Sequence, residues 1–197
     1  MNNSPLNDDY LNSLTYSQLY QHLVNAIISD DLNNVKKIIC FNIRNNADLC
    51  LGQNGPLAIA ASNGNLEILQ YFFTSVDVDF SPIYPEISIV ASQGKQKKII
   101  DYLVNSSDLK TKFDIHFNND ELFRKTCSNL DMVQYLIFDL NIEKTERIEM
   151  YLNYLVLNPP NNGKEIIKMF EKRELAEALK VEMTPDNENS QNKKFKL

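Results

Sequence analysis

The chain has 197 residues, of which 43% are hydrophobic, and its 20 Lys and Arg against 26 Asp and Glu give a net charge of −6. A chain of this length can bury a sizeable core and is most simply one domain. The acidic balance disfavours nucleic-acid binding, and no run approaches the ~18 apolar residues of a membrane span, so we expect neither nucleic acid nor membrane insertion.

The N-terminal segment is polar and acidic, unlike a secretory signal peptide. We expect residues 1–13 to be disordered or loosely docked. The three cysteines (Cys40, Cys50 and Cys127) are odd in number and scattered, which fits a reducing compartment better than a disulfide framework. These features predict a cytoplasmic location.

The first predicted helix begins after a capping box, because Thr15 is followed three residues later by Gln18. Its apolar residues recur at helical spacing to about Ser29. Asp31 can cap the next helix, which we expect to run over residues 32–41.

The clearest pattern in the chain covers residues 55–73 and predicts two short helices folded back to back. Pro56 suits the first turn of a helix, and Gly64 stands where a left-handed residue would end it. The second helix follows at once. The apolar positions share one face of each helix: Leu57, Ala60 and Ala61 on the first, and Leu66, Leu69, Phe72 and Phe73 on the second.

Three weaker copies of this pattern flank it. Residues 23–39 align at an offset of 34 (Ala60 minus Ala26), and residues 87–94 align at an offset of 30 (Gly94 minus Gly64). The second helix of that copy lies one residue later than the offset predicts. A fourth copy spans residues 123–137, where the turn is shorter and has no glycine.

A helix–turn–helix unit with a period of about 33 residues is typical of ankyrin repeats. The chain resembles the ankyrin repeat family over residues 14–140, in the manner of small, stand-alone bacterial and viral arrays. The family pattern Thr-Pro-Leu-His-x-Ala-Ala-x-x-Gly is met best by residues 55–64, where Gly55 and Ala58 replace the Thr and the His. The resemblance implies an all-α solenoid of about four repeats, with β-hairpin fingers from the connectors at 42–54, 74–85 and 105–119.

The repeat pattern fades after Asp139. Thr145 can cap a helix that ends before Pro159, and a charged helix is expected over residues 164–179. We interpret residues 141–181 as a C-terminal helical cap or degenerate repeat, and residues 182–197 as a disordered tail. The inward residues expected on the last helix are Ile166, Ile167, Phe170, Leu175, Ala176 and Leu179.

Groups that could perform chemistry are few. His22 and His116 lie far apart in the sequence, and no phosphate loop, Cys-x-x-Cys or Gly-x-Ser-x-Gly occurs. Cys127 occupies a position where the repeat wants a small buried residue. We therefore predict no enzyme, no catalytic residue, no metal and no cofactor. The alternative is an enzyme or metal site around Asp114 and His116 in the 105–119 connector.

The family geometry implies a binding surface on the first helix of each copy. Ile59 and Ile89, aligned at the 30-residue offset, predict an apolar strip, unless the fingers cover them. Phe80, Tyr84 and Phe117 in the connectors are candidate aromatic anchors or core fillers. The expected protein-binding residues are Asn25, Ile28, Ser29, Ile59, Ser62, Asn63, Ile89, Ser92, Gln93 and Lys125.

The predicted function is non-catalytic recognition of a protein partner by a monomer. The resemblance allows a secreted effector, an inhibitor or an antitoxin-like protein, which would place an exported form in a host cytosol. A self-associating structural module is the other alternative. The basic segment 95–98 is either a docking patch or the solvated end of a helix.

Overall fold

A computed structural model describes residues 6–44, 55–159 and 162–182. Every regular element within these residues is helical, which confirms the all-α prediction. The chain divides into two compact units, residues 1–117 and 118–197, and each is described by itself. The division falls inside the segment predicted as one array, 14–140.

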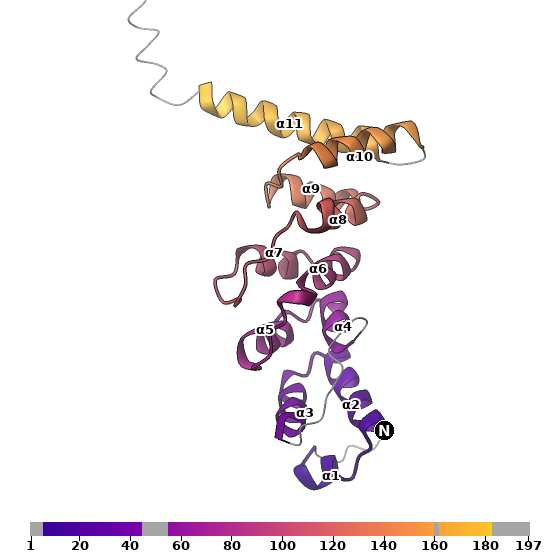
Figure 1. Cartoon of the computed structure of the whole chain (residues 1–197), viewed down its shortest axis with the longest axis vertical. Coiled ribbons are helices and arrows are strands. Elements are labelled where there is room, and N and C mark those ends of the chain that lie inside the picture. The colour runs from indigo at the N-terminus through magenta and orange to yellow at the C-terminus, as the bar shows by residue number, and fades with distance from the viewer. Residues whose placement is uncertain (1–5, 45–54, 160–161, 183–197) are drawn as a thin grey trace, which may run out of the picture. The chain divides into compact units, whose positions relative to one another are not determined.

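The first unit is built from helix pairs that pack in chain order (Figure 1). Helix α4 packs against both α2 and α6, and each of these helices also packs against the helix that follows it. The elements are α1 (Asp8–Asn12), α2 (Tyr16–Ile28), α3 (Leu32–Arg44), α4 (Pro56–Asn63), α5 (Leu66–Ser75), the 3-10 helix η1 (Ser81–Ile83), α6 (Tyr84–Gln93) and α7 (Lys97–Asn105).

Helix α1 lies inside the segment 1–13, which was expected to be disordered or loosely docked. The Asn7 side chain caps it by accepting a hydrogen bond from the Tyr10 amide at 2.8 Å, and Leu11 is buried. The Tyr10 hydroxyl lies 3.2 Å from His22 Nε2 on α2. Of the two alternatives, docking holds for residues 7–12, because a polar cap and one buried leucine hold them on the unit.

The predicted starts of the next two helices are confirmed. The Thr15 amide donates to Gln18 Oε1 at 2.8 Å and the Gln18 amide donates to Thr15 Oγ1 at 3.4 Å, the reciprocal pair of a capping box. Before α3, Asp31 Oδ1 accepts from the Asn34 amide at 3.0 Å.

Helices α2, α4 and α6 end in the same way. In each, a carbonyl near the helix end accepts a hydrogen bond from the amide five residues later, across a residue with left-handed backbone, which is the Schellman motif. The carbonyls belong to Ala26, Ala60 and Ala91, and the amides to Asp31, Asn65 and Gln96, at 2.8, 2.9 and 2.8 Å. The left-handed residues are Asp30, Gly64 and Lys95, with φ of 55°, 85° and 61°.

The third of these turns shifts the repeat register by one residue. Its left-handed residue is Lys95, whereas Gly94 has a φ of −76°. The offset between the second and third copies is therefore 31 (Ala91 minus Ala60) rather than 30. The counterpart of Ile59 is consequently Val90, and the predicted equivalence of Ile59 and Ile89 is wrong.

Burial agrees with the shifted register. Ser88 and Ser92 are buried on α6, and the residues 31 positions earlier, Leu57 and Ala61, are buried on α4. The small hydroxyl side chain of Ser88 bonds to the Pro85 carbonyl at 2.7 Å, so it occupies a core position without an unmet donor.

Gly94 is required by close packing rather than by its own backbone angle. A Cβ atom at this position would lie 2.5 Å from the Ser62 carbonyl oxygen at the end of α4. The same carbonyl accepts a hydrogen bond from Gln96 Nε2 at 3.1 Å. The missing side chain lets the ends of α4 and α6 approach each other.

The connector between α5 and α6 is compact. Within it the structure has η1 and no strand, so the hairpin expected at 74–85 does not form. Phe80 and Tyr84 are buried, with ring centroids 5.8 and 5.1 Å from that of Phe73. These two aromatics fill the core, and the alternative role as exposed anchors is wrong for both. Most of the 42–54 connector lies outside the described residues.

The second unit contains α8 (Phe117–Thr126, whose first residue belongs to the first unit), α9 (Leu130–Phe138), α10 (Glu146–Leu157) and α11 (Gly163–Glu182). The short turn after α8 has no left-handed residue, and Asn129 instead caps α9 by accepting from the Met132 amide at 3.4 Å. Thr145 caps α10 as predicted, with 3.1 Å to the Ile148 amide. Helix α11 packs against α9 and α10.

The buried residues of α11 all lie in its first half. Ile166 and Phe170 lie in the core, but every residue from Glu174 to Val181 is exposed, including Leu175 at 62%. The inward placement predicted for Leu175, Ala176 and Leu179 is wrong, because the helix continues beyond the residues that pack on the unit (Figure 1).

Arg173 joins α11 to the end of α9 and the loop after it. Its Nη1 donates to the carbonyls of Ile142 at 2.6 Å and Ile137 at 3.3 Å, and its guanidinium lies 5.3 Å from the Phe170 ring centroid. Its Nε lies 3.6 Å from Glu177 Oε1, an ion-pair separation longer than a hydrogen bond. A cation at the C-terminal carbonyls of a helix is also favoured by the helix dipole.

We predict that Gly94→Ala lowers the free energy of unfolding by about 1–3 kcal/mol, because the new methyl group would meet the Ser62 carbonyl. The matched control is Asn63→Ala, at the exposed equivalent position of α4, with an expected change within about 0.5 kcal/mol. Urea unfolding followed by circular dichroism measures both. Equal stability of the two variants would show that α4 and α6 do not approach as described.

We also predict that Arg173→Met lowers the free energy of unfolding by about 2 kcal/mol, since two carbonyls lose a charged donor. Arg147→Met, at an exposed site, should change it by less than about 0.5 kcal/mol. Amide hydrogen exchange should accelerate in α11 and not in α4. An unchanged α11 would rule out the clamping role of Arg173.

Candidate functional site

The exposed side chains of α2, α4 and α6 form the candidate surface of the first unit. Ile28, Ser62 and Gln93 each lie two residues after the alanine whose carbonyl accepts the Schellman hydrogen bond. All three side chains are exposed. These three residues occupy the same position relative to equivalent helix ends, and α4 packs against both α2 and α6. We call these three residues the first-helix row.

Ile28 is the apolar member of this row, with 59% of its surface exposed. A second set of residues lies one position before the same alanines and consists of Asn25, Ile59 and Val90. Asn25 is exposed, and Ile59 and Val90 are half-buried. The surface is therefore mostly polar, with single apolar side chains at Ile28, Ile59 and Val90. Val90 was missed by sequence reasoning, although the one-residue lag of the following helix was a signal of the shifted register.

The predicted binding residues divide by exposure. Ile59 and Ile89 are half-buried, and Ser92 is 2% exposed, so Ser92 is wrong as a surface residue. Its position corresponds to that of Ala61 in the core. Lys125 is exposed on α8 and belongs to the second unit. The predicted residues that are exposed on the first unit are Asn25, Ile28, Ser29, Ser62, Asn63 and Gln93.

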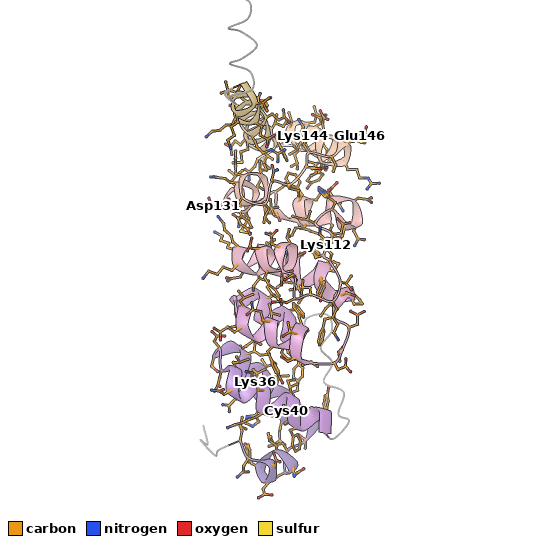
Figure 2. All side chains as sticks on the ribbon, turned by 90° about the vertical axis from the view of Figure 1, so that its left-hand side faces the viewer. Lys36, Cys40, Lys112, Asp131, Lys144 and Glu146 are labelled. Atoms are coloured by element: carbon orange, nitrogen blue, oxygen red, sulfur yellow. The ribbon has the colours of Figure 1, made fainter. Side chains whose placement is uncertain are left out.

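The outer helices α3 and α5 meet through a cluster that the sequence did not indicate. Lys36 and Cys40 lie one turn apart on α3 (Figure 2). Lys36 Nζ lies 5.4 Å from the Tyr71 ring centroid, and Cys40 Sγ lies 3.8 Å from the Tyr71 hydroxyl. Burial, with Cys40 adding to it, raises the pKa of Tyr71 to about 12, so the phenol stays protonated and serves packing.

In the 105–119 connector, the predicted pair Asp114 and His116 is joined through the backbone of His116. The His116 amide donates to Asp114 Oδ1 at 2.8 Å, an ordinary side-chain turn. Across residues 6–44, 55–159 and 162–182, no three His, Cys, Asp or Glu side chains are grouped to hold a metal ion. Within the same ranges, no helix combines the length and apolarity needed to cross a membrane.

Cys127 is a core residue, as predicted. It is buried, and its Sγ donates to the Phe123 carbonyl at 3.2 Å. Burial raises the pKa of the thiol to about 12. A thiol in this state is a poor nucleophile.

Comparison with protein-family models, curated proteins and solved structures gave no match.

We predict that native protein leaves Cys127 unmodified by iodoacetamide at pH 8, while Cys40 reacts, since Cys40 is exposed. With a pKa of about 12, only about one Cys127 thiol in ten thousand is ionised at that pH. Peptide-resolved mass spectrometry measures each site, and unfolding in urea provides the control in which both react. Rapid native labelling of Cys127 would contradict its burial.

Proposed function

We propose that the first unit is an ankyrin-like array of helix pairs that recognises a protein partner through the first helices of its repeats. The observation that carries this proposal is the identical ending of α2, α4 and α6, which repeats one surface position on three successively packed helices. Stacked repeats of this type offer an extended surface rather than one deep pocket.

The composition of this surface supports protein recognition over catalysis. The first-helix row pairs a large exposed apolar side chain, Ile28, with the polar groups of Ser62 and Gln93. Apolar anchors within a polar surround are common at protein interfaces. The proposed interaction depends on the helices and not on hairpin fingers, because the 74–85 connector is helical and compact.

In this proposal the protein acts as a monomer in a cytoplasm, its own or that of a host, as an effector, inhibitor or antitoxin-like binder. The ankyrin resemblance of residues 55–64 motivates this class. The acidic net charge of −6 favours a protein partner over nucleic acid.

The test is Ile28→Arg combined with Gln93→Arg, which places two cations in the first-helix row. We predict loss of a specific partner from quantitative affinity capture, because bulky charges at exposed positions disrupt an interface without disturbing the core. The matched control is Asn33→Arg with Thr74→Arg, at exposed positions on the outer helices α3 and α5.

Both double variants should keep the circular dichroism and the monomeric mass of the wild type. A partner captured by the control and lost by the row variant supports the proposal. Capture that is equal for both variants would overturn the assignment of the surface. A homo-oligomer by light scattering that the row variant dissociates would replace it with self-association.

A further inference from the structure

The second unit has a basic cleft between α8 and α10. Its volume is about 350 Å³, and it is bounded by the end of α8, the face of α10 and the start of α11. Its lining residues are Arg124, Lys125, Cys127, Ser128, Tyr151, Leu155 and Asn162. A second cleft of about 510 Å³ shares Arg124 with the first and is also lined by Asn119, Arg147 and Met150.

The two clefts carry three cations and no carboxylate among their lining residues. This is unusual in a chain whose net charge is −6. Arg124 is held in place, because its Nε donates to the Asn119 carbonyl at 3.1 Å and its Nη2 to the Asn118 carbonyl at 3.2 Å. A guanidinium has five N–H donors, so donors remain for a ligand.

The other two cations are not neutralised by neighbouring side chains. Among the residues the structure describes, no carboxylate lies within ion-pair distance of Lys125 or Arg147. Glu121, one turn before Lys125, instead accepts a hydrogen bond from Asn118 Nδ2 at 3.2 Å. Lys125 and Arg147, which form no ion pair with a described residue, thus line the two clefts together with the fixed guanidinium of Arg124.

Apolar surface runs beside these charges along α10. Met150 is 72% exposed and Tyr154 is 58% exposed, one helical turn apart, and the Tyr154 ring stacks on that of Tyr151 at 6.2 Å. Burial raises the pKa of Tyr151, so its hydroxyl is a hydrogen-bond donor at neutral pH. The surface therefore alternates between anion-binding groups and exposed apolar side chains.

We propose that this basic cleft binds an acidic peptide segment of a protein partner, with carboxylates on Lys125, Arg124 and Arg147 and an apolar residue against Met150 and Tyr154. Arginine pairs with carboxylates through parallel N–H donors, which favours this ligand chemistry. This inference is independent of the first-helix row, because all of its residues lie in the second unit.

An extended segment fits better than a compact ion. Arg147 and Tyr151 are one turn apart, about 6 Å along α10, so the contacts are spread along the helix rather than converging on one point. A peptide also fits better than a nucleic acid, because the acidic remainder of the chain repels a long phosphate backbone.

The test measures fluorescence polarisation of a fluorescein-labelled peptide, Asp-Glu-Phe-Asp-Glu-Leu, with the full-length protein. We expect binding that weakens with added salt. In Lys125→Gln/Arg147→Gln it should weaken about tenfold, as expected for the loss of two partly exposed ion pairs. Arg124 is left intact because it holds the start of α8.

The matched control is Lys98→Gln/Lys168→Gln, which removes two positive charges at exposed positions that line neither cleft. It should bind as the wild type does, and a peptide with Lys in place of each acid should not bind. Equal weakening in both double variants would reduce the effect to net charge and overturn the site. Tighter binding of an oligothymidylate than of the peptide, or no peptide binding at all, would overturn the choice of ligand.

Discussion

The arrangement of the first unit depends on one backbone hydrogen bond that recurs at the ends of α2, α4 and α6. In this bond, the amide of the residue after the left-handed position donates to the alanine carbonyl five residues earlier. It forms at Ala26, Ala60 and Ala91, and it reverses the chain so that the next helix folds back on the one before. Because the bond fixes where each helix ends, it also fixes which side chains face the neighbouring pair. The surface proposed for recognition follows from this register.

The turns are also the places where neighbouring pairs touch most closely. The Ser62 carbonyl faces the bare Cα of Gly94 and the side chain of Gln96. Small residues at Ala60 and Ala91 let the first helices approach, while Phe72 and Phe73 fill the space beneath the second helices. Burying an aromatic side chain of this size contributes roughly 2–3 kcal/mol.

In the second unit, polar side chains hold the turns and the helix ends in place. The Thr145 hydroxyl caps α10 and also donates to the buried carboxylate of Asp120 at 2.7 Å. Asp120 closes a run of three left-handed residues, which Arg124 holds through two backbone carbonyls. Lys144 Nζ lies 3.2 Å from Glu174 Oε1, next to the carbonyls that Arg173 binds. Arg173 and the Lys144–Glu174 ion pair thus add polar contacts to the burial of Ile166 and Phe170 on α11.

The sequence by itself determined where several helices begin and end, because the capping box at Thr15, the left-handed Gly64 and the cap at Thr145 act through neighbours along the chain. It did not determine the repeat register. Gly94 is a residue type that commonly ends a helix, but here its missing side chain allows close contact with Ser62, 32 residues earlier (Gly94 minus Ser62). It also did not reveal the basic cleft, whose residues come from α8, the turn after it, α10 and the loop before α11. Only tertiary packing decided these features, because they depend on distances between segments that no local pattern encodes.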